Sequence, residues 1–86
     1  MKKERYIVRQ VEAWASPEGW DYNNVFVIGE LKTSAKNVRK AFTAYLRKHG
    51  IIFKKARTLI EFDGDNYTIL DRKTKEPVFD AIFQYD

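Results

Sequence analysis

The feature that most limits how this chain can fold is a single helical pattern set among segments with the spacing of β-strands. Apolar residues recur between residues 34 and 49 at the i, i+3, i+4 and i+7 positions that form one face of a helix. Thr33 or Ser34 can cap the N-terminus of this helix through a side-chain oxygen, and Gly50 provides a left-handed stop after it. We therefore predict one amphipathic helix over residues 34–49.

Segments rich in β-branched and aromatic residues lie on both sides of this helix and predict strands. These segments are residues 6–14, 24–31, 57–62, 67–71 and 78–85. Short connections favour antiparallel pairing, and one helix can cover one face of such a sheet. A chain of 86 residues has room for one hydrophobic core. The sequence therefore predicts a single small α+β domain over residues 1–86, with two layers, an antiparallel sheet and the element order ββαβββ.

The stretch WASPEGWDYNN, residues 14–24, joins the first two predicted strands and is rich in aromatic residues. Within it, SPEG at residues 16–19 has the composition of a turn. We expect an antiparallel hairpin with a long, aromatic-rich connection. Trp14 and Trp20 are expected to cover the open end of the core and to keep their indole N–H groups near water. The alternative is that Trp14, Trp20 and Tyr22 form a protein contact, because exposed Trp and Tyr often anchor interfaces.

Charge is distributed unevenly along the chain. Residues 31–60 contain nine basic residues and no acidic residue, although the formal net charge of the whole chain is only +4. On a helical wheel, the basic residues of the predicted helix lie in a narrow arc opposite its apolar face. The candidate residues for binding an anionic partner are Lys36, Arg39, Lys40 and Arg47 on the helix, with Lys54, Lys55 and Arg57 after it.

A basic helix face of this kind can bind the backbone of a nucleic acid or an acidic protein. It can also be a solvated surface, since Lys and Arg are good helix formers that favour solubility. The absence of acidic residues favours binding, because like charges at i, i+4, such as Lys36 and Lys40, destabilise a helix. No zinc-finger, helix-turn-helix or RNA-recognition motif is present, so a nucleic acid would be contacted through its backbone.

These observations lead to two predictions of function. The first is a small accessory binding protein that engages an acidic partner, either a nucleic-acid backbone or a protein, through the basic helix face. The second is a protein-interaction or self-associating module that uses the region of Trp14, Trp20 and Tyr22 or an edge strand. Salt separates them, since phosphate binding weakens steeply as salt rises.

Residue types that carry out catalysis or bind metal ions are sparse. The chain has no cysteine, and its one histidine, His49, falls in the last turn of the predicted helix. Asp63 and Asp65 flank Gly64 but lack the ligand spacing of a calcium-binding loop, and a hairpin turn explains them. We therefore expect a non-enzymatic protein without catalytic residues, metal or cofactor. The longest apolar run, residues 25–28, is far shorter than the roughly 20 residues of a membrane helix, which favours a cytoplasmic protein.

Two stretches carry a resemblance to a known group of proteins. AWASPEGWDYNNVFVIGE combines a Trp, a short turn, Gly-Trp, a nearby Asn and a Gly-Glu at the end of the next strand. IEFDGDNYTILDRKTKEPVFDA has the form of a two-strand ending. Together they cover about half the chain, and they are similar to short open reading frames of phages and mobile elements in Gram-positive bacteria. That group has no established activity, so the resemblance implies a small accessory protein that acts by binding and assigns no site residue.

Overall fold

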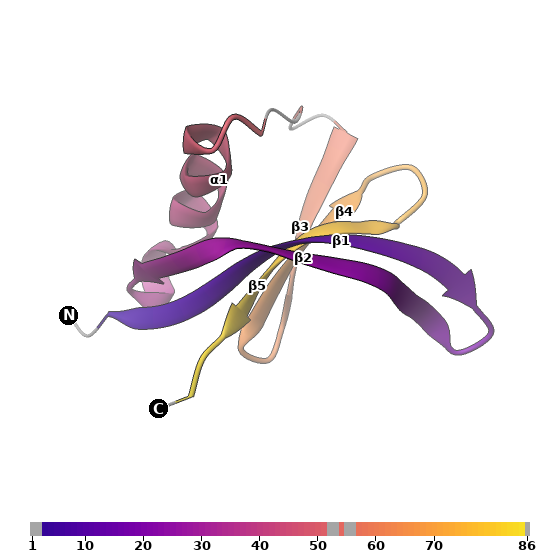
Figure 1. Cartoon of the computed structure of the whole chain (residues 1–86), viewed down its shortest axis with the longest axis horizontal. Helices are drawn as coiled ribbons and strands as arrows, with labels where there is room; N and C mark the ends of the chain where they lie inside the picture. Colours follow the sequence, from indigo (N-terminus) through magenta and orange to yellow (C-terminus); the bar gives the residue numbers. More distant parts are fainter. Residues whose placement is uncertain (1–2, 52–53, 55–56, 86) are drawn as a thin grey trace.

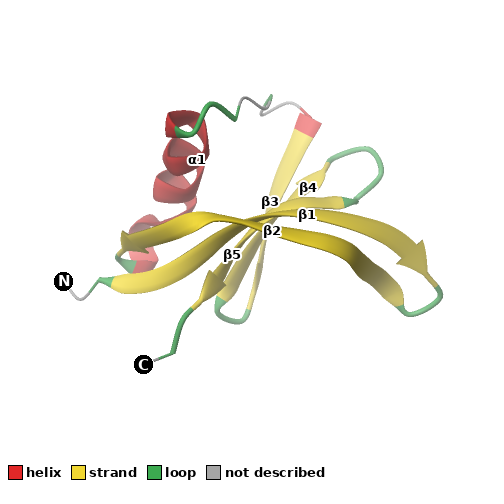
Figure 2. Cartoon of the chain, viewed as in Figure 1, coloured by secondary structure: helices red, strands yellow, loops and turns green. Residues whose placement is uncertain are grey.

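The computed structural model describes residues 3–51, 54 and 57–85 and has an α+β fold (Figures 1 and 2). Its elements in chain order are β1 (Glu4–Ser16), β2 (Gly19–Thr33), the short 3-10 segment η1 (Ala35–Asn37), α1 (Val38–Lys48), β3 (Thr58–Asp63), β4 (Asn66–Asp71) and β5 (Pro77–Phe83). The predicted α+β fold class is confirmed, because the described residues form one five-stranded antiparallel sheet and one helical segment.

The strands lie in the order β2-β1-β5-β4-β3, so β2 and β3 are the two edges of the sheet. β1 pairs with β2 along its whole length, from Glu4 to Ser16, but pairs with β5 only from Tyr6 to Gln10. Beyond Gln10 the two strands therefore continue as a two-stranded ribbon that extends past the rest of the sheet (Figure 1). We call this ribbon, residues 11–25, the hairpin arm.

The expected long connection between the first two strands is wrong. β1 and β2 are joined by a two-residue turn at Pro17 and Glu18, and the aromatic residues of the stretch lie within the paired strands. Gly19 closes the turn with a φ of 131°, a backbone conformation that favours glycine. The strands are consequently longer at both ends than the predicted ranges 6–14 and 24–31.

The expectation that Trp14 and Trp20 cover the core is also wrong. Trp14 is 50% exposed and Trp20 is 38% exposed. The reason is that the hairpin arm extends beyond β5, whose pairing with β1 ends at Gln10, so the part of the arm that carries Trp14 and Trp20 lies outside the core. Two large apolar side chains are therefore presented to solvent on a projecting element.

The core lies where one face of the sheet meets α1. Its buried residues are Tyr6, Val8, Leu31, Val38, Phe42, Leu46, Ile69 and Ala81. The apolar face of α1 was predicted from the helical spacing, and the burial of Val38, Phe42 and Leu46 agrees with it. The helix approaches β2 closely at Gly29, where a Cβ atom would overlap the hydroxyl of Tyr45.

The helix begins differently from the prediction. Residues 35–37 form a 3-10 turn, and the α-helix starts at Val38. Ser34 is the residue before the turn, but its side chain makes no capping hydrogen bond, and its buried Oγ has no partner within the described residues. The backbone carbonyl of Ser34 instead accepts a bond of 2.9 Å from the N–H of Asn37. Among the described residues, no helix has the length and apolar composition needed to cross a membrane.

Candidate functional site

The side of the helical segment that faces away from the sheet carries the basic residues expected from the helical wheel. Lys36, Arg39, Lys40 and Arg47 are all exposed, as is the neighbouring Lys48. Lys40, Arg47 and Lys48 border a shallow hollow along the helix, together with Thr43 and Ala44. The four predicted residues are thus all exposed, and the hollow brings Lys40 and Arg47 together.

None of these helix cations has an ion-pair partner within the described residues. The ion pairs found there join residues of the sheet. Arg9 pairs with Asp80 at 2.6 Å, while Arg5 and Lys32 each lie 3.9 Å from Glu30. Within the described part of the chain, no carboxylate therefore pairs with the basic face of the helix, and the run without acidic residues is consistent with this.

The position of the cations along the helix determines whether the helix dipole favours or disfavours them. The first turn of α1 contains no acidic residue but does contain Arg39 and Lys40. The helix dipole disfavours positive charge there and favours it in the last turn, where Arg47 and Lys48 lie. Half of this basic face therefore opposes the stability of the helix, by roughly 0.3–1 kcal/mol per charge when exposed.

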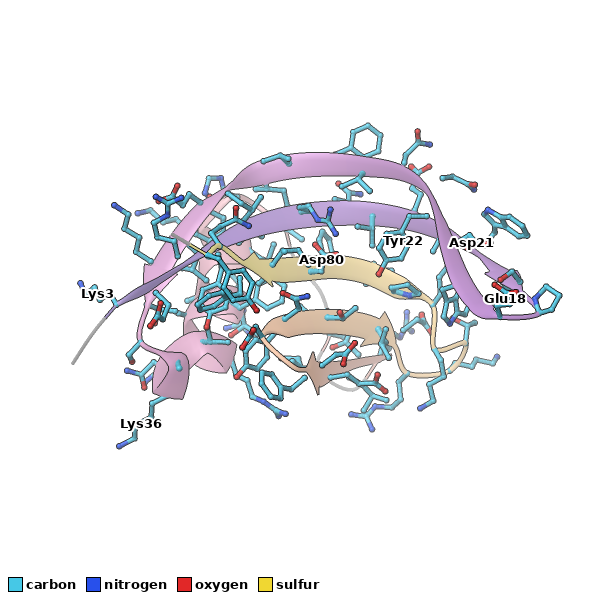
Figure 3. The ribbon with its side chains drawn as sticks, turned by 90° about the horizontal axis from the view of Figure 1, so that it is seen from below. Lys3, Glu18, Asp21, Tyr22, Lys36 and Asp80 are labelled. Atoms are coloured by element: carbon cyan, nitrogen blue, oxygen red, sulfur yellow. The ribbon has the colours of Figure 1, made fainter. Side chains whose placement is uncertain are left out.

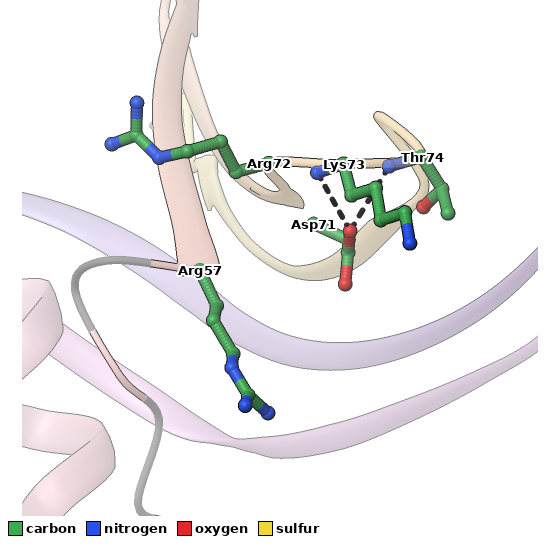
Figure 4. A pocket seen from close by; sticks show the side chains of 5 residues that line it. All are labelled: Arg57, Asp71, Arg72, Lys73 and Thr74. Carbon is green, nitrogen blue, oxygen red and sulfur yellow. Dashed lines mark hydrogen bonds between the residues drawn. The ribbon is translucent and has the colours of Figure 1, made fainter.

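A second basic cluster lies where β3 begins and β4 ends (Figure 4). Pairing of Thr58 with Asp71 brings Arg57 beside Arg72, whose N–H donates to the Arg57 carbonyl at 2.7 Å. Arg57, Arg72 and Lys73 border an open hollow of about 460 Å³. Arg72 and Lys73 were not among the predicted site residues, and the signal for them was the basic run RKTK at residues 72–75.

The carboxylate in this hollow is already engaged by the backbone. Oδ1 of Asp71 accepts hydrogen bonds from the N–H groups of Lys73 at 2.9 Å and Thr74 at 3.0 Å (Figure 4). These bonds, that of Thr74 most strongly, hold the pKa of the Asp71 carboxyl below its ordinary value. The carboxylate of Asp71 therefore stabilises the turn between β4 and β5. Arg57 has no ion pair among the described residues.

The C-terminal end of the first basic cluster lies on the same side of the molecule as the second cluster. The C-terminal end of α1, the start of β3 and the turn between β4 and β5 all lie at the upper side of the view in Figure 1. Lys54 is exposed between them, and its carbonyl accepts a bond of 2.9 Å from the N–H of Arg57. The predicted site residue Lys55 lies outside the described residues. We call the combined set the basic surface: Lys36, Arg39, Lys40, Arg47, Lys48, Lys54, Arg57, Arg72 and Lys73.

The aromatic residues of the hairpin arm form a separate feature. Trp20 and Tyr22 pair with Ala15 and Ala13, so they share one face of the arm, whereas Trp14 belongs to the opposite face. The structure therefore leaves all three partly exposed without gathering them into one cluster. Acidic residues accompany them at Glu12, Glu18 and Asp21, so the arm carries the opposite charge to the basic surface.

Tyr22 also approaches the ion pair of the sheet. It shares a face with Arg9, and burial raises the pKa of its hydroxyl, with a further contribution from the charge of Asp80. Figure 3 shows Tyr22 and Asp80 near the middle of the sheet, away from the tip of the arm. The side chain of Tyr22 therefore lies close to the ion pair of the sheet and away from the tip of the arm.

The residues that the structure describes contain no group of three His, Asp or Glu side chains that could hold a metal ion. Comparison with models of protein families, with curated proteins and with solved structures found no match for this chain.

Proposed function

We propose that this protein is a non-enzymatic binding module whose basic surface engages the phosphate backbone of a nucleic acid. The observation that carries the proposal is the set of exposed cations on the helix that have no ion pair with any described residue. Two of them, Arg39 and Lys40, occupy the first turn of α1. A solvated face usually mixes both signs of charge, because this relieves repulsion at i, i+4. A bound polyanion would offset both the repulsion and the unfavourable interaction with the dipole.

The second basic cluster supports the same partner. Arg57 and Arg72 offer guanidinium groups, whose planar arrangement of donors matches the oxygens of a phosphate group. They lie beside an open hollow on the same side of the molecule as the C-terminal end of α1. Contacts from Lys and Arg to phosphate fix position without reading sequence, so the proposal is for binding with little sequence preference. An accessory role in a phage or mobile element stays a prediction.

The test is a fluorescence titration with labelled single- and double-stranded oligonucleotides at several salt concentrations. Each phosphate neutralised on a duplex contributes about −0.9 to the slope of log K against log salt. If Lys36, Arg39, Lys40 and Arg47 all contact phosphates, affinity should fall roughly a hundredfold when salt rises about fourfold. Replacing Lys36 and Lys40 with Gln should reduce this fall to roughly tenfold, because two contacts are lost.

The matched control removes the same charge from elsewhere. Lys3→Gln with Lys32→Gln also lowers the net charge by two, and both residues are exposed outside the basic surface. This control should keep the salt slope of the unmodified protein. If both double variants lose the same part of the salt slope, the effect depends only on net charge, and the proposal is contradicted. Failure to bind any oligonucleotide at low salt, together with salt-sensitive binding of polyglutamate, would identify an acidic protein as the partner instead.

A further inference from the structure

The two edges of the sheet differ in how they are protected against pairing with another chain. β3 has six residues and carries the acidic residues Glu61 and Asp63, which are exposed. β2 has 15 residues, and the part from Asn23 to Gly29 contains neither a charged residue nor a proline. Charged side chains and short length are the usual means of preventing edge-to-edge contact. The part of the β2 edge from Asn23 to Gly29 has no charged residue, and it lies within a long strand.

The unprotected part of β2 is also apolar and exposed. Val25 is 40% exposed, Phe26 51% and Val27 67%. They lie between two irregularities of the ladder, at Asn23 and Ile28, each of which is left out of the register with β1. The register with β1 is uninterrupted between them, so residues 24–27 offer a continuous row of backbone groups on the side away from β1.

We propose that this protein self-associates by antiparallel pairing of β2 with β2 of a second copy. A two-fold axis near Phe26 places Val25 of one copy opposite Val27 of the other, so the exposed apolar residues meet on both faces. Such an arrangement is self-complementary and closes after two copies. Unpaired backbone groups on the two edges supply the hydrogen bonds of the new ladder.

The sequence of the exposed segment favours a second copy as the occupant of this edge. Val25-Phe26-Val27 reads the same in both directions, so the segment is complementary to itself about Phe26. The irregularities at Asn23 and Ile28 confine the regular pairing to residues 24–27, so the charged residues of β2 lie outside the contact. The contact therefore consists of apolar side chains and backbone groups that are equivalent in the two copies.

Sedimentation velocity over a range of protein concentrations measures this association. We expect a monomer–dimer equilibrium of modest affinity, because the regular part of the edge is short. Val27→Lys should weaken dimerisation about tenfold or more, since it brings like charges to the two-fold axis in an otherwise apolar contact. Glu61→Lys places the same side chain on the other edge strand and should leave the equilibrium unchanged. Circular dichroism checks that both variants keep the sheet.

A second pair of substitutions tests the position of the contact along β2. Phe26→Lys should weaken the dimer at least as much as Val27→Lys, because Phe26 lies at the two-fold axis and meets Phe26 of the second copy. Glu18→Lys, at the tip of the hairpin arm, should leave the equilibrium unchanged, because this residue lies outside the contact. A protein that stays monomeric at every concentration would overturn the proposal, as would a dimer that is insensitive to Val27→Lys. Oligonucleotide binding is measured separately, so failure of one proposal leaves the other standing.

Discussion

Arg9 and Asp80 are joined by two parallel hydrogen bonds across the ladder between β1 and β5. Nε of Arg9 donates to Oδ1 of Asp80 at 2.8 Å, and Nη2 donates to Oδ2 at 2.6 Å. The side chain of Asp80 is 1% exposed, whereas that of Arg9 is 25% exposed. The bond to Asp80 raises the pKa of the Arg9 guanidinium above its ordinary value. A buried carboxylate is thus balanced by one cation that reaches it from the surface.

We predict that Arg9→Met lowers the free energy of unfolding by roughly 3–5 kcal/mol. Removing one partner of a buried pair leaves the other charge uncompensated in a low-dielectric site. Denaturant unfolding at neutral pH measures the change. Lys32→Met is the matched control, because Lys32 lies 3.9 Å from the exposed Glu30, and such surface pairs contribute about 0–1 kcal/mol. Similar losses in the two variants would show that the Arg9 pair is no more than a surface contact.

The order of elements and the apolar face of the helix could be predicted from the sequence, because both depend on local spacing. Val38, Phe42 and Leu46 follow a helical period that needs no knowledge of the rest of the chain. The length of the hairpin arm could not be predicted in this way. It depends on where β5 stops pairing with β1, and β5 begins at Pro77, far along the chain.

The candidate site was predicted in part for the same reason. Lys36, Arg39, Lys40 and Arg47 are neighbours on one helix, so the wheel places them together. Arg72 joins Arg57 only because β3 and β4 pair, and the sequence pattern gave the strands but did not assign their register. The pair of Arg9 and Asp80 is separated by 71 positions, and no local pattern connects residues so far apart.

The contact between Gly29 and Tyr45 gives a second prediction. A Cβ atom at residue 29 would overlap the hydroxyl of Tyr45, whose ring also packs against His49 with centroids 4.4 Å apart. Gly29→Ala should therefore destabilise the protein by about 1–3 kcal/mol, the usual effect of overpacking. Adding Tyr45→Phe removes the overlapping oxygen and leaves Cζ of the ring at 3.4 Å.

Thermal unfolding of the single and double variants measures this relationship. Gly29→Ala should lower the melting temperature, and the double variant should recover most of the loss. Tyr45→Phe alone provides the baseline for the lost hydroxyl. If the double variant is as unstable as Gly29→Ala, the cost comes from the backbone of β2 and not from the approach of the helix.

Tyr6 gives a prediction for alkaline pH. Burial, and then the charges of Tyr67, Glu4 and Asp65, raise the pKa of its hydroxyl above the ordinary value of 10.0. An unfolded chain then loses this proton more readily than the folded protein does, so the contribution of Tyr6 to stability is complete below pH 10.0. This contribution is lost as the pH rises from 10.0 through the raised pKa of the folded protein.

Denaturant unfolding as a function of pH measures the effect, with Tyr6→Phe as the comparison. The unmodified protein should lose stability more steeply than the variant above pH 10.0, and the two slopes should agree below it. The other groups that titrate in this range are common to both chains. Parallel curves over the whole range would show that the hydroxyl of Tyr6 ionises alike in the folded and unfolded chains.

Asp71 gives a prediction for acid pH that concerns one turn. Its carboxylate accepts the N–H groups of Lys73 and Thr74, and these bonds lower its pKa below the ordinary value of 3.8. The stabilisation of the turn is therefore present above pH 3.8 and is lost as the pH falls through the lowered pKa of the folded protein.

Amide hydrogen exchange, corrected for its intrinsic pH dependence, measures this stabilisation. The amides of Lys73 and Thr74 should still be protected near pH 3.8. Asp71→Ala should remove this protection at neutral pH, whereas Asp71→Asn should keep part of it, because its amide oxygen still accepts. If the amides are equally protected in Asp71→Ala and in the unmodified protein, the turn is held by backbone hydrogen bonds alone. These bonds run from the N–H of Asp71 to the carbonyl of Glu76 and from the N–H of Lys75 to the carbonyl of Asp71.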